Sequence, residues 1–506
     1  MDAIAAYAEL QKRGRDVATL QGLQSLLSWD EETYMPRGGT ENRGEQAALV
    51  GGLVAERLAA KPFADLLDHV EASALVRDPD GDVAANVREW RRQHQRYSRL
   101  PRALVEELKR TSAHAQHAWV DARNARSFSM FLPWLEKLVA LKREEARCLM
   151  TALDATEPYD ALLDEHEPGA RTADLEMMFS SLTSSLVPLV QRIVAAPKKP
   201  DRSLLSRGFD MERQRVLAEI VASAVGFDFG HGRLDTTTHP FCITVGSGDV
   251  RITTRFSDDV SDGFFGTLHE AGHGLYEQGL PRDAVGTACG SVLSLGLHES
   301  QSRLWENLVG RSEAFWRSFF PLFQRMFPAA MHGVGFEDWL RANNDVAPSP
   351  VRVRADEVTY NLHVVIRFEI ERALIAGALE ARDIEVAWNA AYERLLGIKP
   401  PDAKEGCLQD VHWSAGLFGY FPTYTLGNLY SAQLFEAAQR DVPGLLLAIE
   451  KGHFAPLTAW LRDKVHRHGG RYPAKKLVEL ATGAPPTADA FLRHLKKKAQ
   501  FVFGVG

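Results

Sequence analysis

Two histidines and a glutamate lie close together in His-Glu-Ala-Gly-His, residues 269–273. On an α-helix, four residues turn the chain through about 400°, so His269 and His273 would project from one face, one turn apart. Two neutral imidazoles at this spacing suit a Zn²⁺ ion, and Glu270, one step around the helix, can accept a proton from a water activated there. The motif therefore predicts a metal-dependent hydrolase. The alternative is a polar helix face that carries two hydrogen-bonded histidines.

The helix that would carry this motif is expected over Ser261–Gly279. Ser261 and Asp262 are suited to cap its N-terminus, and Gly279, with Pro281 soon after, is typical of a C-terminal cap. Gly272 weakens a helix but allows close approach by a substrate or by a second helix. The apolar residues that would anchor the helix in a core are Phe264, Phe265, Leu268, Leu275 and Tyr276.

A catalytic zinc ion needs a third protein ligand and one open position. Tyr276 and Gly279 stand where a metzincin would have glycine and histidine, so that class is excluded. The best candidate is Glu299, which lies 299 − 273 = 26 positions after the second histidine. That spacing allows the first helix to end, a loop to turn, and a second helix to return beside it, as in gluzincins. His298 and Glu306 remain alternatives.

Further motifs occur in order along the chain, and together they carry a family resemblance. They are Trp29-Asp30-Glu31-Glu32-Thr33-Tyr34-Met35-Pro36, His239-Pro240-Phe241, Asp249-Val250-Arg251-Ile252-Thr253, His298-Glu299-Ser300-Gln301, Val351-Arg352-Val353-Arg354-Ala355-Asp356 and Gly406-Cys407-Leu408-Gln409-Asp410-Val411-His412-Trp413. With the motif at 269–273, the chain resembles the carboxypeptidase Taq family of bacterial and archaeal metallocarboxypeptidases nearly from end to end.

The resemblance implies a mainly α, saddle-shaped, two-lobed fold similar to neurolysin and angiotensin-converting enzyme. A deep central groove and a small β-hairpin beside the zinc helix are expected. It also implies a zinc-dependent carboxypeptidase that releases single C-terminal residues from peptides with broad specificity. One Zn²⁺ per chain, which Co²⁺ can replace, and a homodimer are expected as well.

An exopeptidase must recognise a free carboxylate, and a guanidinium group suits this because it can form two parallel hydrogen bonds. Arg352 lies in the family element linked to C-terminal recognition, and Arg354 is the second choice. The alternative for either arginine is a structural salt bridge with Asp356 or Glu357. His239 is placed among the substrate-binding residues, although Pro240 after it also suits a purely structural turn.

The segment from Asp410 to Tyr424 is rich in glycine and aromatic residues, as are segments of related metallopeptidases that present a histidine and tyrosines to the substrate. His412 is assigned to binding of the substrate or the tetrahedral intermediate. Tyr420 or Tyr424 is assigned to the oxyanion, and the sequence does not choose between them. Aromatic packing in the core is the alternative for both tyrosines. Gln409 and Asp410 are expected to accept hydrogen bonds from the ligand imidazoles.

Phe241–Val245 and Asp249–Phe256, joined by Gly246-Ser247-Gly248, are predicted to form a β-hairpin. Its edge strand could pair with an extended peptide. Asp249 and Arg251 are expected to attach the hairpin to its surroundings.

At 506 residues the chain is longer than most single domains, yet no clean linker is evident. The stretches 78–82 and 197–201 have the composition of short turns, so residues 1–506 are predicted to form one catalytic unit. The helices expected from apolar periodicity are Ala103–Ala122, Phe131–Ala152, Thr172–Ala195, Ala355–Leu379, Leu426–Ala438 and Thr487–Lys498.

The composition, with 25% charged residues and a net charge of −7, is that of a soluble globular protein. No extended basic stripe suggests a nucleic-acid partner, and no apolar run suggests a membrane span. The polar N-terminus and four scattered cysteines predict a cytoplasmic protein with reduced thiols: Cys148, Cys242, Cys289 and Cys407.

Two other functions remain open at this point. An endo-acting oligopeptidase on the same scaffold would use the same zinc ion but would not need an arginine for the terminal carboxylate. A metal- or peptide-binding protein without turnover would not need Glu270.

Overall fold

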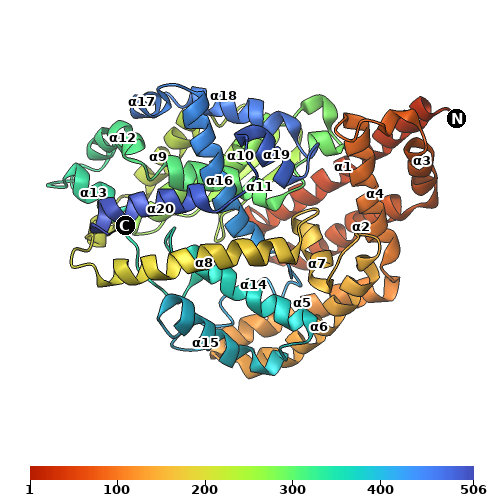
Figure 1. Ribbon diagram of the computed structural model, residues 1–506, viewed down its shortest axis with the longest axis horizontal. Coiled ribbons are helices and arrows are strands. Elements are labelled where there is room, and N and C mark those ends of the chain that lie inside the picture. The colour runs from red at the N-terminus through yellow and green to blue at the C-terminus, as the bar shows by residue number, and fades with distance from the viewer. Residues whose placement is uncertain (506) are drawn as a thin grey trace. The chain divides into compact units, whose positions relative to one another are not determined.

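The structure, a computed structural model, describes residues 1–505 and consists mainly of helices. Helices account for 69% of the chain, and a three-stranded sheet is added to them. The prediction of a mainly α fold with a small sheet is confirmed (Figure 1).

The chain divides into two compact units, each built from three separate stretches of sequence. The first unit comprises Met1–Ser98, Pro200–Asn343 and Tyr430–Pro486, and the second comprises Arg99–Lys199, Asn344–Leu429 and Thr487–Gly506. The predicted turn at 197–201 therefore contains a boundary between units, whereas the turn at 78–82 lies inside the first. That all residues form one catalytic unit stays a prediction.

Along the chain, helices of the first unit come both before and after the three strands. They are α1 (Ala3–Thr33), α2 (Thr40–Ala59), α3 (Lys61–Glu71), α4 (Asp82–Arg99, up to Ser98), α9 (Met211–Val225), α10 (Val260–Gly279), α11 (Leu295–Arg303), α12 (Glu313–Met326), α13 (Phe336–Ala342), the second part of α16 (Pro422–Asp441), α17 (Leu445–Glu450), α18 (Ala455–Lys464) and α19 (Ala474–Thr482). Those of the second unit are α5 (Arg102–Ala125), α6 (Phe128–Met150), α7 (Pro158–His166), α8 (Thr172–Ala195), α14 (Tyr360–Ala376), α15 (Ile384–Leu396), the start of α16 and α20 (Asp489–Phe503).

All six helices expected from periodicity are present; α8 has the predicted bounds, and the other five have shifted ends. The largest shifts are five positions, at the end of α20, which reaches Phe503 instead of Lys498, and at the start of α14, which begins at Tyr360 instead of Ala355. The Asp356 carboxylate accepts hydrogen bonds from the backbone N–H groups of Val358 and Thr359 at 2.9 and 3.0 Å, and this forms a turn ahead of the helix. At the other end, Gly377 has a φ of 80° and terminates the helix.

The predicted hairpin is present as β2 (Cys242–Gly246) and β3 (Asp249–Thr254), which pair in antiparallel fashion. A third strand, β1 (Gly232–Thr236), was not predicted from the sequence; it pairs in parallel with β3, so β3 is the central strand. The sequence Gly-Arg-Leu-Asp-Thr has little of the β-branched and aromatic character that marks a strand. The hairpin leads directly into α10, which packs against β3.

The zinc-motif helix α10 is anchored by the apolar residues expected from the sequence. Phe264 is buried and lies within 5.1–6.1 Å, between ring centroids, of four aromatic rings of α12: Phe315, Trp316, Phe319 and Phe323. Aromatic pairs at such distances stabilise a core beyond their buried area. The motif therefore lies on a helix fixed by a rigid aromatic cluster.

The ends of α10 differ from the prediction. Asp259, not Ser261 or Asp262, caps its N-terminus by accepting a hydrogen bond from the backbone N–H of Ser261 at 2.9 Å. Gly279 is the last helical residue rather than a left-handed cap, and a Cβ there would lie 2.5 Å from the His466 ring. This glycine is needed for close packing.

Helix α8 is long and apolar enough, by length and composition alone, to cross a membrane. One face, with Leu175, Phe179 and Leu182, is buried in the second unit, whereas Ser180 and Ser184 are exposed. It runs beside α20 (Figure 1). This two-faced pattern is typical of a core helix of a globular unit.

Candidate metal centre and active site

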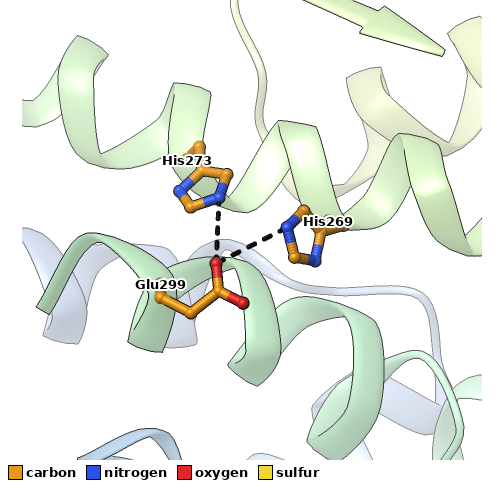
Figure 2. Close-up of side chains that lie close together, drawn as sticks. All are labelled: His269, His273 and Glu299. Carbon is orange, nitrogen blue, oxygen red and sulfur yellow. Dashed lines mark ion pairs between the residues drawn. The ribbon is translucent and has the colours of Figure 1, made fainter. Parts of the chain in front are cut away.

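The first unit brings together the three residues predicted as metal ligands. His269 and His273 project from one face of α10 and point at Glu299 of α11 (Figure 2). Glu299 Oε2 lies 3.6 Å from His269 Nε2 and 3.4 Å from His273 Nε2. Ligands bonded to a tetrahedral Zn²⁺ at about 2.0–2.1 Å lie about 3.3–3.4 Å apart. The donor set and its spacing therefore fit one divalent metal ion.

Gly272 explains how the two helices come so close. A Cβ at this position would lie 2.5 Å from the backbone oxygen of Gln301 and 2.7 Å from Cα of Ser302. Of the two roles considered for this glycine, the structure supports close approach by a second helix. A larger residue would push α11, and Glu299 with it, away from the histidines.

The two alternative third ligands have other partners. His298 Nε2 lies 3.0 Å from Glu277 Oε1, and the His298 ring stacks on that of His273 with centroids 4.3 Å apart. Glu306 Oε2 lies 2.9 Å from His269 Nδ1, the nitrogen that faces away from Glu299. Glu306 thus fixes the orientation of His269, a role that carboxylates commonly have next to metal-bound imidazoles.

The expectation that Gln409 and Asp410 would accept hydrogen bonds from the ligand imidazoles is wrong. The Gln409 side-chain oxygen accepts from the backbone N–H of Arg352, Asp410 pairs with two arginines, and Glu306 is the partner of His269. Glu306 lies on a π-helical turn, η6 (Leu304–Val309), that continues α11. Arg303 contacts both carboxylates, at 2.6 Å from Glu299 and 3.3 Å from Glu306. Residue spacing gives no signal for a π-helical turn, so this partner could not be found from the sequence.

The two imidazoles differ in their affinity for protons in the metal-free protein. Burial lowers the pKa of His269, but the charges of Glu299 and Glu306 outweigh it and raise this pKa to about 8. For His273, burial and the neighbouring His298 lower the pKa to about 3. The Glu299 carboxylate is buried, yet Arg303 and the histidines hold its pKa well below the ordinary value. Near neutral pH His269 is therefore protonated and His273 is neutral, so a metal ion must displace a proton from His269 but none from His273.

Glu270 lies between the two histidines in sequence and is 5% exposed. Burial, reinforced by the charge of Glu299, raises its pKa to about 7. A carboxyl group with this pKa can both accept and release a proton near neutral pH, which is what a general base that later acts as an acid requires.

Arg352 lies in the second unit, in the short turn η7 (Arg352–Arg354), and is 5% exposed. Its Nε and Nη2 each lie 2.8 Å from Asp410 Oδ1, and Nη1 donates to the Tyr360 hydroxyl at 2.9 Å. Asp410 also contacts Arg367 at 2.8 Å. Burial raises the pKa of Asp410, but the two guanidinium groups outweigh it and hold this pKa below its ordinary value.

The salt bridges considered as alternatives for the two arginines are not formed. Glu357 pairs with His494, at 2.9 Å, and with Lys498 of α20, while Asp356 forms the turn before α14. Arg354 is exposed, and its side chain makes no hydrogen bond or ion pair with any residue in the described part of the chain. Of the two, only Arg352 is held in a fixed position.

His412 and the two tyrosines are also brought together in the second unit. The Tyr424 hydroxyl lies 3.2 Å from His412 Nε2, and the Tyr420 ring lies 5.3 Å from the His412 ring between centroids. Burial and the charge of Arg352 lower the pKa of His412 to about 3, so its imidazole is neutral at neutral pH. The guanidinium of Arg352 lies 4.9 Å from the centroid of the Tyr424 ring. Tyr424 is therefore the tyrosine that contacts both His412 and Arg352.

Comparison with known proteins gives the same family along the whole chain. Residues 9–499 match the model of the carboxypeptidase Taq (M32) metallopeptidases. The chain belongs to this family. It is 46% identical to thermostable carboxypeptidase 1 of Thermus thermophilus, with 99% of each chain covered, and 36% identical to carboxypeptidase 1 of Bacillus subtilis, with 94% of each covered. An M32 carboxypeptidase structure from Deinococcus radiodurans R1 matches with a TM-score of 0.95 and 40% identity over 99% of this chain and 100% of that one.

The protein is therefore a metallocarboxypeptidase, and the predicted activity is confirmed over an endo-acting oligopeptidase and over a binding protein without turnover. Its substrates are peptides, as the family implies. The family also implies a divalent metal ion, which the group His269, His273 and Glu299 could hold.

Two family motifs of this carboxypeptidase attach the sheet to α1. Arg251 forms a two-point salt bridge with Asp249, at 2.9 and 2.8 Å, and its guanidinium lies 4.1 Å from the centroid of the Trp29 ring. The Tyr34 hydroxyl donates to the buried carboxylate of Asp235 at 2.7 Å. These contacts agree with the structural role expected for Asp249 and Arg251.

His239 of the carboxypeptidase lies in the loop between β1 and β2 and is exposed. Its side chain has no hydrogen-bond partner among residues 1–505. Its assignment to substrate binding stays a prediction.

Proposed function

We propose that the carboxypeptidase binds one Zn²⁺ per chain through His269, His273 and Glu299, and that Co²⁺ can take its place. The observation that carries this proposal is the spacing of the three donor atoms, at 3.4 and 3.6 Å from Glu299 Oε2 to the two imidazole nitrogens. When bound, zinc supplies Lewis acidity, which polarises a scissile carbonyl and acidifies water. Two imidazoles and one carboxylate are a donor set typical of catalytic zinc sites with an open position.

Glu270 acts in this proposal as the general base and then as the general acid. Its pKa of about 7, raised by burial, allows it to take a proton from the attacking water and to give it to the leaving amine.

Arg352 is proposed to bind the C-terminal carboxylate of the peptide. Asp410 and Tyr360 engage three of its five N–H groups, which leaves two for a ligand. Because Asp410 holds the guanidinium in place, less conformational entropy is lost when a substrate binds. Arg354, exposed and not fixed, is the second choice.

His412 and Tyr424 are proposed to donate hydrogen bonds to the substrate or to the tetrahedral intermediate, with Tyr420 as the alternative tyrosine. His412 and Tyr424 share one hydrogen bond, so when the Nε2–H of the neutral imidazole donates to the Tyr424 hydroxyl, the hydroxyl proton is the donor available to the substrate. Fixed donors of this kind stabilise a developing oxyanion.

The enzyme is further proposed to release single residues with broad side-chain preference, and to work as a homodimer in the cytoplasm. The family resemblance supports the first two statements. Four free cysteines support the third, because unpaired thiols are typical of a reducing compartment.

The experiment that tests the function compares two forms of one peptide, with a free C-terminal carboxylate and with a C-terminal amide. Zinc-loaded enzyme should produce a ladder of peptides shortened from the C-terminus of the free acid, and mass spectrometry should find the amide almost intact. Chelator-treated enzyme is the control and should leave both intact. Internal cleavage of both peptides at equal rates would contradict the proposal.

A further inference from the structure

Residues 411–421, here called the His412 loop, carry His412 and Tyr420 without forming a helix or a strand. Local turns bend the loop back on itself, including a hydrogen bond of 2.9 Å from the backbone N–H of Leu417 to the carbonyl of His412. Gly416 and Gly419 have positive φ values of 76° and 83°. Because regular secondary structure is missing, other groups must fix the distance between the two functional side chains.

Glu371 of α14 is the group that contacts the loop at two points. Its Oε1 accepts a hydrogen bond from Trp413 Nε1 at 2.8 Å, and its Oε2 accepts one from the backbone N–H of Gly419 at 2.9 Å. Trp413 directly follows His412, and Gly419 directly precedes Tyr420. A single carboxylate thus holds the neighbours of both functional residues.

The carboxylate of Glu371 is also fixed to the rest of the second unit. The Tyr159 hydroxyl of α7 donates to its Oε2 at 2.6 Å, and the residue is fully buried. The three groups that donate to Glu371 are neutral: a tyrosine hydroxyl, an indole N–H and a backbone N–H. The ammonium group of the nearby Lys142 pairs instead with Glu145, at 2.6 Å. Burial raises the pKa of Glu371 to about 7, although these hydrogen bonds act in the opposite direction. The three hydrogen bonds satisfy both oxygens of the buried carboxylate, which only accept.

The loop has little room to move around these contacts. A Cβ at Gly419 would lie 2.8 Å from the carbonyl group of Leu162 on α7, so the loop backbone lies directly on that helix. His166 Nε2 lies 3.2 Å from the carbonyl oxygen of Phe418, and the His166 ring lies 5.0 Å from the Tyr420 ring between centroids. The Tyr420 ring is thus in contact with His166 as well as with His412.

We propose that Glu371 is a positioning residue for peptide hydrolysis: by holding Trp413 and Gly419 it sets the placement of His412 and Tyr420. This inference rests on the proposed function, in which His412 and a tyrosine bind the substrate or the intermediate. Glu371 itself is buried and acts through the loop. A displacement of reacting groups by about 1 Å can cost about 100-fold in rate, so loss of one loop contact should be visible in kcat.

Two variants that each remove one donor from the same carboxylate test the proposal. Trp413→Phe removes the donor that belongs to the His412 loop, and Tyr159→Phe removes the donor that belongs to α7. Each removes one hydrogen bond to a buried carboxylate, so both should lower Tm by a similar few degrees. Trp413→Phe should lower kcat by about 10- to 100-fold with little change in KM. Tyr159→Phe leaves both contacts between Glu371 and the loop in place, so it should lower kcat clearly less than Trp413→Phe does.

Equal kcat values for the two variants at equal Tm would overturn the proposal and leave Glu371 a purely structural residue. If Trp413→Phe fails to fold, Glu371→Gln carries the test, because it keeps the shape of the side chain and turns one acceptor into a donor. It should bind the same amount of zinc as the unsubstituted enzyme, with a lower kcat, and an unchanged kcat would again overturn the proposal. Failure of the proposed function is distinguishable, since the unsubstituted enzyme would then release no residue from a free-ended peptide.

Discussion

The two side-chain clusters of this carboxypeptidase have opposite electrostatic character. In the first unit, the imidazoles of His269 and His273 lie against the carboxylates of Glu299 and Glu306. In the second unit, one carboxylate, Asp410, lies between two guanidinium groups. In the first arrangement two imidazole nitrogens and a carboxylate oxygen face one another, which suits a metal cation although Arg303 also contacts both carboxylates. The second leaves one positive charge in excess, which favours an anion.

The clusters also differ in how the chain assembles them. The metal cluster comes from α10, α11 and η6, within 306 − 269 = 37 positions of sequence. The second cluster combines η7, α14 and the His412 loop, and the Arg352–Asp410 contact spans 58 positions. The first is therefore fixed by helix geometry, and the second depends on how an irregular segment folds.

The largest effect is expected for Glu270→Gln, which tests whether peptide hydrolysis takes place at the metal cluster. The amide cannot take a proton from water, so kcat should fall by about 100- to 10,000-fold. Zinc content, measured by elemental analysis, should stay at one ion per chain, because Glu270 is not among the three donors. A variant as active as the unsubstituted enzyme would remove Glu270 from the mechanism.

The next largest effect is expected for Arg352 in the second unit, where two arginines and Asp410 form the cluster that favours an anion. Arg352→Gln removes a charge-assisted interaction with the terminal carboxylate, worth about 1.5–3 kcal/mol, so kcat/KM for a free-ended peptide should fall by about 10- to 150-fold. The rate for the same peptide with a C-terminal amide should hardly change. Steady-state kinetics on the two peptides measure this loss of discrimination.

Arg354→Gln is the matched control for this prediction, because Arg354 lies in the same turn but is exposed. It should keep the preference for the free acid. If instead Arg354→Gln loses the preference and Arg352→Gln keeps it, the assignments of the two arginines must be exchanged.

The same contrast explains what the sequence could and could not predict. His269 and His273 were predictable because the helical period decides which residues share a face, and Glu299 was predictable because 26 residues allow a loop and a returning helix, as in gluzincins. The Asp410 partner of Arg352 was missed because nothing in the sequence fixes the path of residues 397–421, which contain no helix or strand. Asp356 and Glu357, the partners considered in the alternative of a structural salt bridge, are near in sequence but have other contacts.

Failures within the first unit have local causes. Glu306 could not be assigned to His269 because it lies on the π-helical turn η6, which apolar periodicity does not indicate. Gly279 was interpreted as a helix cap, but it makes room for His466, a contact over a long sequence distance. Strand β1 is polar, and its parallel pairing with β3 is set by tertiary structure.

A smaller effect is expected for Glu306→Gln, which tests whether metal binding depends on a residue outside the three donors. Loss of the carboxylate next to His269 Nδ1 should weaken zinc binding by about 10- to 100-fold. Competition with a chromophoric chelator measures this affinity. Glu277→Gln is the control, because Glu277 contacts His298 and not a donor residue. Equal losses in both variants would show that general negative charge, rather than orientation of His269, determines affinity.

The last effect, about tenfold for each pH unit, is the pH dependence of zinc binding, which distinguishes the two imidazoles. The pKa of His269 in the metal-free protein is raised to about 8, chiefly by Glu299 and Glu306 against the effect of burial, whereas that of His273 is lowered to about 3. Below about pH 8, zinc must displace one proton, so the apparent affinity should fall about tenfold per pH unit between pH 8 and pH 6 and level off above pH 8.

Isothermal titration calorimetry in two buffers of different ionisation enthalpy measures the protons released. One proton per zinc ion at pH 6.5 would match a protonated His269 and a neutral His273, whereas a second proton would come either from His273 or from Glu270, whose pKa is about 7, and the same titration on Glu270→Gln tells the two apart. In Glu306→Gln the His269 pKa should drop, because a charge that raises it is gone. The onset of proton release should then move to lower pH, although the affinity itself is weaker. A lower His269 pKa by itself would strengthen zinc binding below pH 8, because fewer protons would compete with the metal ion. A weaker affinity together with a lower onset would therefore separate the orienting effect of Glu306 from the effect of its charge on the His269 pKa.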